Sequence, residues 1–291
     1  MVLQSFVYAF VSASLIVLVG MGFQIIFRVG RFFHFAHGGI FAVAPYLMFL
    51  FGIWIQFPLW LALFLSLSIC VLLGLAMEFF CYYPIRKISN PANTLLLCSL
   101  GIFIILQSLL ALGFGNETRS LRRTPVVEGW LMMGIRLTTI QVLIIVCAAI
   151  CLISLWTFIR FTRVGKQMEA VASDPDLARA VGIDIEGIYL WTIGLGSALA
   201  AIAGILTSYD VDMSPTMGMQ PLMMGVVATI IGGNTLLGMA GGALLLGMTQ
   251  HLNVIWLSSK WQDAIIFAIL ILFLLFRPQG FLGKPLRKTA A

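Results

Sequence analysis

The chain has 291 residues, of which 61% are hydrophobic and only 10% are charged. Soluble domains carry roughly 45–50% apolar and about 25% charged residues, so this composition excludes an ordinary soluble protein and predicts one that lies in a lipid bilayer. Much of the formal net charge of +6 flanks apolar runs, which indicates membrane topology rather than nucleic-acid binding, and we expect no nucleic-acid partner.

Successive apolar runs of about 20 residues, enough to cross some 30 Å of hydrocarbon as helices, follow one another along the chain. They cover 5–27, 35–55, 57–80, 92–114, 138–160, 188–208, 236–256 and 261–276. A shorter run, 222–232, is rich in glycine, which predicts a broken or re-entrant helix buried in protein. We therefore expect an all-α, polytopic membrane protein with about 8–9 transmembrane helices, forming a single domain over residues 1–291.

The first run is expected to be a retained span rather than a cleavable signal peptide. No Lys or Arg precedes it, it is longer than the apolar core of a signal, and Arg28 and Arg31 follow it. The five cysteines lie in or beside apolar runs and form no CxxC pair, which favours small packing residues over a metal or redox site.

Basic residues predict the orientation, because short cytoplasmic loops accumulate Lys and Arg. If the short run crosses the membrane, twelve basic residues share the side of the C-terminus: Arg28, Arg31, Arg86, Lys87, Arg160, Arg163, Lys166, Arg179, Arg277, Lys284, Arg287 and Lys288. Five lie on the opposite side: Arg119, Arg122, Arg123, Arg136 and Lys260. This bias predicts an N-terminus outside and a cytoplasmic C-terminus, with the cluster at 118–123 as a local exception.

The loop 161–187 contains an unusually hydrophilic stretch, "GKQMEAVASDPDLARAVG". Asp174 suits the N-cap of a short helix, Pro175 suits its first position, and Gly182 suits the left-handed residue that ends it. Helices below about 12 residues are marginal in water, so this one should be held by its flanking spans or by a partner.

We expect Leu177, Ala178 and Val181 to form the apolar side of this short helix, at positions i, i+1 and i+4. A capped helix with an apolar side on the cytoplasmic face could dock into a partner surface. The alternative, from these residues alone, is a solvated loop between two spans.

Residues 162–206 resemble the cytoplasmic coupling region and following helix of permease subunits in branched-chain amino acid ABC importers. Three further stretches are similar to the same family in order and spacing: "HFAHGGIFAVAPY" (34–46), "ATIIGGNTLLGMAGGALLLG" (228–247) and "KWQDAIIFAILILFLLFRPQGFLG" (260–283). Together they cover most of the chain from residue 20 to 284, whereas 115–137 carries no such resemblance. His34 stands where an asparagine is more usual in the family.

The resemblance implies two sets of functional residues. Contact with an ATPase would involve Gly165, Glu169, Ala170, Asp174, Pro175, Leu177, Ala178, Val181 and Gly182. The translocation path or gate would involve His34, Phe35, His37, Gly38, Thr229, Gly232, Gly233 and Asn234.

The partners that the resemblance implies are a second permease subunit, two cytoplasmic ATPase subunits and an extracytoplasmic substrate-binding protein. The location would be a bacterial inner membrane, and the solute a branched-chain or other small aliphatic amino acid. Related permeases for urea, short amides or simple sugars are the alternative. No GxxxxGK[ST] loop is present, so we expect no cofactor and no catalysis in this chain, with ATP–Mg bound by the partner ATPases.

Two rival classes depend on ionisable residues within the spans. His34 and His37 could share a helix face and hold a metal in a membrane-embedded enzyme, but no Cys or carboxylate nearby completes a site. Histidines that start a helix or bond a neighbouring span are the simpler interpretation. A proton-coupled carrier would need a carboxylate at the membrane centre, and the spans offer only Glu78 and Asp263, near opposite faces.

Overall fold

The computed structural model describes residues 2–88, 92–122, 130–132, 135–233, 235–252, 259–277 and 280. Within these ranges the chain is almost entirely helical, and the predicted all-α membrane class is confirmed. The exception is a small antiparallel hairpin of β1 (Trp130–Met132) and β2 (Ile135–Leu137).

Six helical segments of the described chain are long and apolar enough to cross a bilayer. They contain α1 (Val2–Gly30), α2 (Ala36–Phe49), α3 (Leu59–Met77), α5 (Ala92–Phe114), α6 (Thr139–Phe161) and α9 (Ile185–Asp210). A π-helical turn, Leu50–Trp54, extends α2, and another, Glu78–Tyr82, joins α3 to α4 (Tyr83–Ile88). These segments match the first six predicted runs in number and order.

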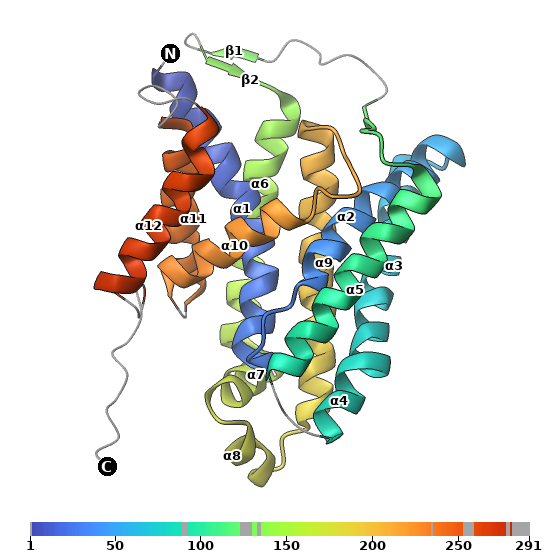
Figure 1. Ribbon diagram of the computed structural model, residues 1–291, viewed down its shortest axis with the longest axis vertical. Coiled ribbons are helices and arrows are strands. Elements are labelled where there is room, and N and C mark those ends of the chain that lie inside the picture. Colours follow the sequence, from blue (N-terminus) through green and yellow to red (C-terminus); the bar gives the residue numbers. More distant parts are fainter. Residues whose placement is uncertain are drawn as a thin grey trace.

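The short glycine-rich run forms a broken structure, as predicted. Helix α10 (Met219–Gly232) meets α11 (Leu236–Leu252) at a bend of 119°, so the pair is either one broken span or a re-entrant loop. In Figure 1, α10 runs across the long axis of the molecule. A 3₁₀ turn (Ser259–Trp261) then leads into the shorter apolar helix α12 (Gln262–Phe276).

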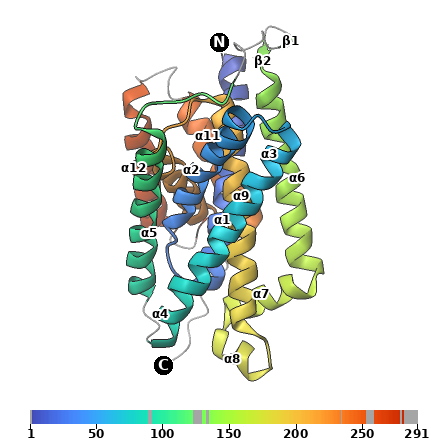
Figure 2. The same ribbon diagram turned by 90° about the vertical axis from the view of Figure 1, so that its right-hand side faces the viewer.

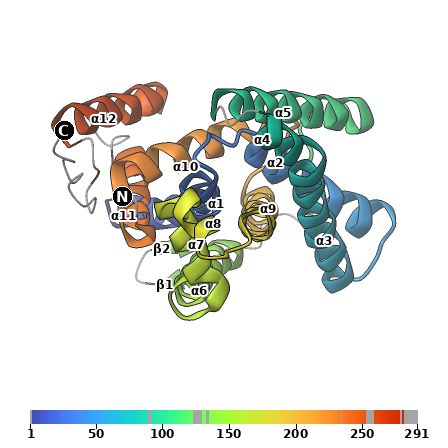
Figure 3. The same cartoon turned by 90° about the horizontal axis from the view of Figure 1, so that it is seen from below.

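Helix α1 forms the centre of the bundle, with α9 beside it, while α3 and α5 lie on one side and α11 and α12 on the other (Figure 3). About 72% of the most apolar window of α1 is buried, against 22% in α3 and α6. The outer helices α3, α5 and α6 therefore present the Leu, Ile and Phe side chains that face hydrocarbon, such as Phe64, Ile105 and Ile150.

Glycines allow the backbones to meet where α10 turns into α11. A Cβ on Gly232 would collide with the backbone of Gly238, and one on Gly204 of α9 would collide with the carbonyl of Phe41 in α2. Small residues at such contacts let helices pack by van der Waals attraction where no hydrophobic force acts between them.

The two ends of the bundle differ in character (Figures 1 and 2). The start of α1 and the β1–β2 hairpin lie at one end, whereas α4, α7 (Arg163–Ser173) and α8 (Pro175–Ala180) lie at the opposite end. Five spans, α1, α2, α3, α5 and α6, lie between the start of the chain and α7, and an odd number of spans places α7 at the opposite end.

The basic cluster at 118–123 was the exception to the charge bias, and two of its arginines have a structural role. Arg119 donates from Nε and Nη2 to the carbonyl of Phe114 at 3.1 and 2.7 Å, and so satisfies the end of α5. Its backbone forms a bridge with Met213, and Arg122 lies 3.7 Å from Asp212. The loops after α5 and α9 are thereby joined.

Candidate coupling and gating sites

Helix α8 has the caps that the sequence predicts. Asp174 Oδ1 accepts from the backbone N–H groups of Asp176 and Leu177 at 3.0 and 3.1 Å, and Pro175 occupies the first turn. Gly182 has a φ of 86°, the left-handed conformation that ends the helix. The carboxylate at the N-terminus also interacts favourably with the helix dipole.

The apolar side of α8 differs from the prediction. Leu177 and Val181 are 63% and 70% exposed, whereas Ala178 is buried at 3%. One residue along a helix is about 100° around its axis, so Ala178 turns inward toward α7 and α9. Of the three predicted apolar residues, only Leu177 and Val181, at i and i+4, remain exposed. Ala178 packs inside the chain, so its predicted place on the exposed apolar side was wrong.

Helix α7 is fixed to the end of α6 by its N-terminal turn. Thr162 Oγ1 accepts from the N–H of Gly165 at 3.0 Å. A Cβ on Gly165 would collide with the backbone of Phe158 and Ile159 in α6, so this residue permits the tight corner and is buried rather than exposed to a partner. In the same helix, Glu169 is exposed and Ala170 is partly buried.

The other end of α7 is tied to α1 by Arg31. This residue follows the last turn of α1 in the left-handed region, with a φ of 54°. Its Nη2 donates to the carbonyls of Ala172 and Ser173 at 3.2 and 2.7 Å. A cation at the C-terminal carbonyls of α7 is favoured by the helix dipole, so α7 connects the central helix to the exposed α8.

His34 and His37 are both fully buried, but they do not share a helix face as expected. His34 precedes α2 and His37 lies in its first turn, with ring centroids 6.3 Å apart. The Nε2–H of His37 donates to the carbonyl of Val19 in α1 at 3.2 Å, which confirms a bond to a neighbouring span. No group of three or more His, Cys, Asp or Glu side chains suited to a metal occurs in the described residues.

Complete burial disfavours the charged form of the His34 ring. Its ring packs against Phe32 and Tyr82, with centroids 5.7 and 5.4 Å away. A neutral ring packed among aromatic rings suits the start of a helix inside the membrane better than a catalytic base.

Phe35 and Gly38 lie beside the start of α10. The N–H of Phe35 donates to Ser99 Oγ in α5 at 3.1 Å. A Cβ on Gly38 would come within 2.8 Å of the carbonyl of Gly218, the residue before α10. Phe35 also packs against a cluster of apolar side chains that includes Phe23 of α1.

Thr229, Gly232 and Gly233 lie at the opposite end of α10. Thr229 donates to the carbonyl of Gly225 in its own helix at 2.8 Å, and Gly233 has a φ of 82° at the break. Asn234 lies outside the described residues. Because 14 helical residues rise about 21 Å, the contact of Gly38 with Gly218 lies far along α10 from Gly232 and Gly233.

Gln24 holds the break between α10 and α11, and we did not predict its role. Its Nε2 donates to the carbonyls of Gly233 and Thr235 at 3.1 and 3.0 Å, and the residue is fully buried in α1. Non-helical backbone at membrane depth needs such partners. The available signal was a single glutamine inside the apolar run 5–27.

A buried ion pair, also not predicted, joins the α3–α4 segment near the end of the bundle that carries α7 and α8. Arg86 pairs with Glu78, which is 2% exposed, and stacks over the ring of Tyr189 in α9 at 3.9 Å. Removing one partner of a buried charged pair would leave the other charge uncompensated, so this contact is costly to break. It fixes this end of α3 to α9.

Comparisons with known proteins agree with this architecture. A family model described as "Branched-chain amino acid transport system / permease component" matches residues 5–274. The high-affinity branched-chain amino acid transport system permease protein LivH of Salmonella typhimurium is 29% identical over 92% of this chain and 91% of its own length. The corresponding protein BraD of Pseudomonas aeruginosa is 27% identical over 97% of this chain and 96% of its own.

The solved structure of PsaBC from Streptococcus pneumoniae in complex with Fab has a similar fold. The TM-score is 0.52 at 14% sequence identity, and the match covers 94% of this chain and 90% of that chain. At this identity the likeness concerns the fold alone.

Proposed function

The chain belongs to the family of permease components of branched-chain amino acid transport systems, and we propose that it is a membrane subunit of an ATP-driven importer for these amino acids. It would act in a bacterial inner membrane with a second permease, two cytoplasmic ATPase subunits and an extracytoplasmic binding protein. The full-length similarity to LivH and BraD supports this assignment. The chain would transmit motion and itself carry out no chemical step.

The observation that carries the proposal is the exposed, capped α8 on a helix that is tied to the spans. Leu177 and Val181 offer a partner an apolar surface. Two contacts of α7 would transmit a displacement of α8 to the spans: Gly165 packs against α6, and Arg31 bonds the end of α7 to α1. Closure of the ATPase pair would therefore move α7 together with α1. A switch between two packed arrangements requires rigid attachments of this kind.

The gate in this proposal is the α10–α11 break. Helix α1 reaches it through Gln24, which bonds to both Gly233 and Thr235. A motion of α1 would thus act on the turn, while Gly38 at the other end of α10 slides against Gly218. Asn234 belongs to the same turn in the sequence and is proposed to share this role.

Transport by a reconstituted complex tests the function. In proteoliposomes containing both permeases, the ATPases and the binding protein, we expect ATP-dependent uptake of labelled leucine, isoleucine and valine. The purified chain alone should hydrolyse no ATP, because its sequence has no phosphate-binding loop of the GxxxxGK[ST] type. Uptake of urea or a sugar with no response to these amino acids would favour the alternative substrates, and turnover by the isolated chain would contradict the proposal.

The proposed orientation places α7 and α8 in the cytoplasm and the start of α1 outside. Ser173 and Asp212 are both exposed and lie near opposite ends of α9. In a cysteine-free background, Ser173→Cys should react with an impermeant thiol reagent only after the membrane is opened. Asp212→Cys should react from outside in intact cells, and the reverse pattern would refute the orientation.

A further inference from the structure

Three cations gather where the outer helix α6 ends and α7 begins, and we call them the cationic corner. Arg160 lies in the last turn of α6, Arg163 is the first residue of α7, and Lys166 follows one turn later. All three side chains are exposed, and no ion pair joins them to an acid among the described residues. Neighbouring members are three residues apart, at most about 11 Å along the chain, so their long side chains can meet at one ligand.

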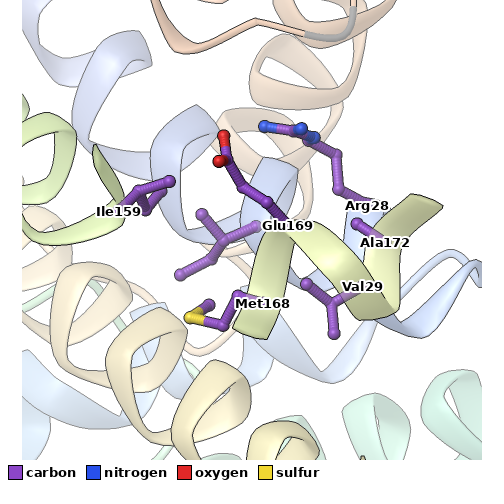
Figure 4. Close-up of a pocket in the computed structure, with 7 residues that line it drawn as sticks. Arg28, Val29, Ile159, Met168, Glu169 and Ala172 are labelled. Atoms are coloured by element: carbon purple, nitrogen blue, oxygen red, sulfur yellow. The ribbon is translucent and has the colours of Figure 1, made fainter. Parts of the chain in front are cut away.

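Two of these charges oppose the preference that the other helices at this end follow. The N-terminus of a helix carries a partial positive charge and favours acidic side chains. The first turns of α8 and α9 each contain an acid, whereas α7 begins with Arg163 and has no acid in its first turn. The nearest acid along α7, Glu169, lies beside Arg28 of α1 (Figure 4). Departures from local preference are typical of functional surfaces, and this one points to an anion supplied from outside the chain.

The cationic corner continues an apolar stripe of α6 that faces hydrocarbon. Residues seven apart lie on nearly the same face of a helix, so Val146 and Ile153 stand in line with Arg160. Their exposed fractions are 47% and 62%. Ile153 lies about 10 Å from Arg160 along the helix axis, which is within the depth of one leaflet of a bilayer with about 30 Å of hydrocarbon. Figure 2 shows α6 at an outer edge of the bundle, with α7 leaving its lower end.

Aromatic side chains place the same corner at the level of the lipid headgroups. The guanidinium carbon of Arg160 lies 5.3 Å from the centroid of the Trp156 ring. Trp156 in turn meets Phe161 edge-on, with centroids 6.1 Å apart, and Phe161 is 69% exposed. Tryptophan is enriched at membrane interfaces. An anion that reaches Arg160 therefore lies at the edge of the bilayer, beside the apolar stripe.

We propose that the cationic corner binds the headgroup of an anionic phospholipid such as phosphatidylglycerol. The phosphate would accept from Arg160, Arg163 and Lys166, since charge-assisted hydrogen bonds are the strong ones, and one acyl chain would lie along Ile153 and Val146. Anionic lipids give the cytoplasmic leaflet its negative surface potential, which agrees with the proposed orientation of α7. The bound lipid would offset the repulsion at the start of α7 and hold this helix at the end of α6.

Native mass spectrometry of the full chain in detergent measures this binding. Phosphatidylglycerol is compared with phosphatidylcholine of the same acyl chains, so that the headgroup charge is the variable. We expect a preference of roughly 100-fold for phosphatidylglycerol, because each of three cations near the headgroup contributes about fivefold. The double variant Arg163→Gln/Lys166→Gln should reduce the preference to about fivefold.

The matched control is Arg136→Gln, which removes an exposed cation in β2, at the opposite end of the bundle. It should retain the full preference. A preference that survives in the double variant would overturn the proposal, since the lipid would then lie elsewhere. Glycerol 3-phosphate that binds as tightly as phosphatidylglycerol would also overturn it, because a free phosphate would then bind without the apolar stripe.

Thermal unfolding in nanodiscs distinguishes lipid binding from a packing role of the cations. The unaltered chain should have a higher Tm in phosphatidylglycerol than in phosphatidylcholine, and the double variant should lose this difference. In phosphatidylcholine the double variant should be at least as stable as the unaltered chain, because two repulsive charges leave the start of α7. A variant that is equally destabilised in both lipids would refute the proposal, since the cations would then serve packing.

An acidic surface of the ATPase is the other partner that could meet these cations, and co-purification separates the two. The double variant should keep the ATPase subunits when phosphatidylcholine and phosphatidylglycerol are both present. Loss of the ATPases at an unchanged lipid preference would assign the cationic corner to that partner and overturn the lipid site. None of these measurements requires uptake, so an importer of another solute would leave the lipid site standing.

Discussion

Leu177→Asp is expected to abolish uptake while the protein still inserts in the membrane. The side chain is 63% exposed, so the isolated fold tolerates the change. In the assembled importer the same position would be covered by the ATPase, and an unpaired carboxylate there costs on the order of several kcal/mol when it is desolvated. Co-purification of the ATPase subunits should fall together with uptake, at an unchanged amount of the permease in the membrane.

Two variants on α8 make this result specific. Arg179 is exposed and lies about 200° around the helix from Leu177, so Arg179→Gln should retain ATPase association. Asp174→Ala removes the cap and should cost about 1 kcal/mol, which predicts a partial loss of uptake. Normal uptake and association in Leu177→Asp would mean that α8 is a solvated loop.

The caps of α8 could be predicted because they depend on neighbouring residues alone. An aspartate before a proline, with a glycine eight residues after the aspartate, specifies a start and a stop through local hydrogen bonds and the permitted φ. The structure has both, at Asp174 and Gly182. The burial of Ala178 depends on where α7 and α9 lie, which a short segment does not encode.

The first six spans were predicted well for a similar reason, whereas the expected total of 8–9 is corrected to six among the described residues, or seven if the bent α10–α11 pair is one span. A run of apolar residues gives its length directly, and residues 92–114 coincide with α5. The glycine content of 222–232 likewise predicted a break, and α10 and α11 bend by 119° there. The hydrogen bond from Gln24 to Gly233 at this break could not be predicted, because the two residues are 209 positions apart in the sequence.

The sequence could not show which of the predicted gate residues lie close together, because their contacts join distant parts of the chain. Sequence resemblance placed Gly38 and Gly233 in one set, yet Gly38 contacts the residue before α10 and Gly233 follows its last residue. Resemblance identifies segments with shared chemistry but gives no distance between them. The structure instead connects each segment to α1: His37 through Val19, and Gly233 through Gln24.

Gln24→Leu is expected to destabilise the α10–α11 break and to remove most uptake. Two carbonyls lose their donor, at roughly 1–3 kcal/mol each, while the unpartnered Oε1 of Gln24 is relieved by a similar amount. The net loss of about 1–3 kcal/mol corresponds to several degrees in Tm, since 1 kcal/mol shifts a large domain by about 2–4 °C. Thermal unfolding of the purified chain in nanodiscs measures this loss.

The larger effect falls on transport, because this amide is the side chain of α1 that hydrogen-bonds to the turn, whereas the rest of α1 packs on the bodies of α10 and α11. Without it, a displacement of α1 leaves Gly233 and Thr235 behind, and ATP hydrolysis by the complex should continue with little uptake. Gln107→Leu is the matched control: Gln107 lies half-buried in the outer helix α5 and makes no hydrogen bond recorded among the described residues. This variant should keep both Tm and uptake, because leucine suits a lipid-facing position. If Gln24→Leu behaved like Gln107→Leu, the turn would be stable without α1, and the gate would have to be moved by another helix.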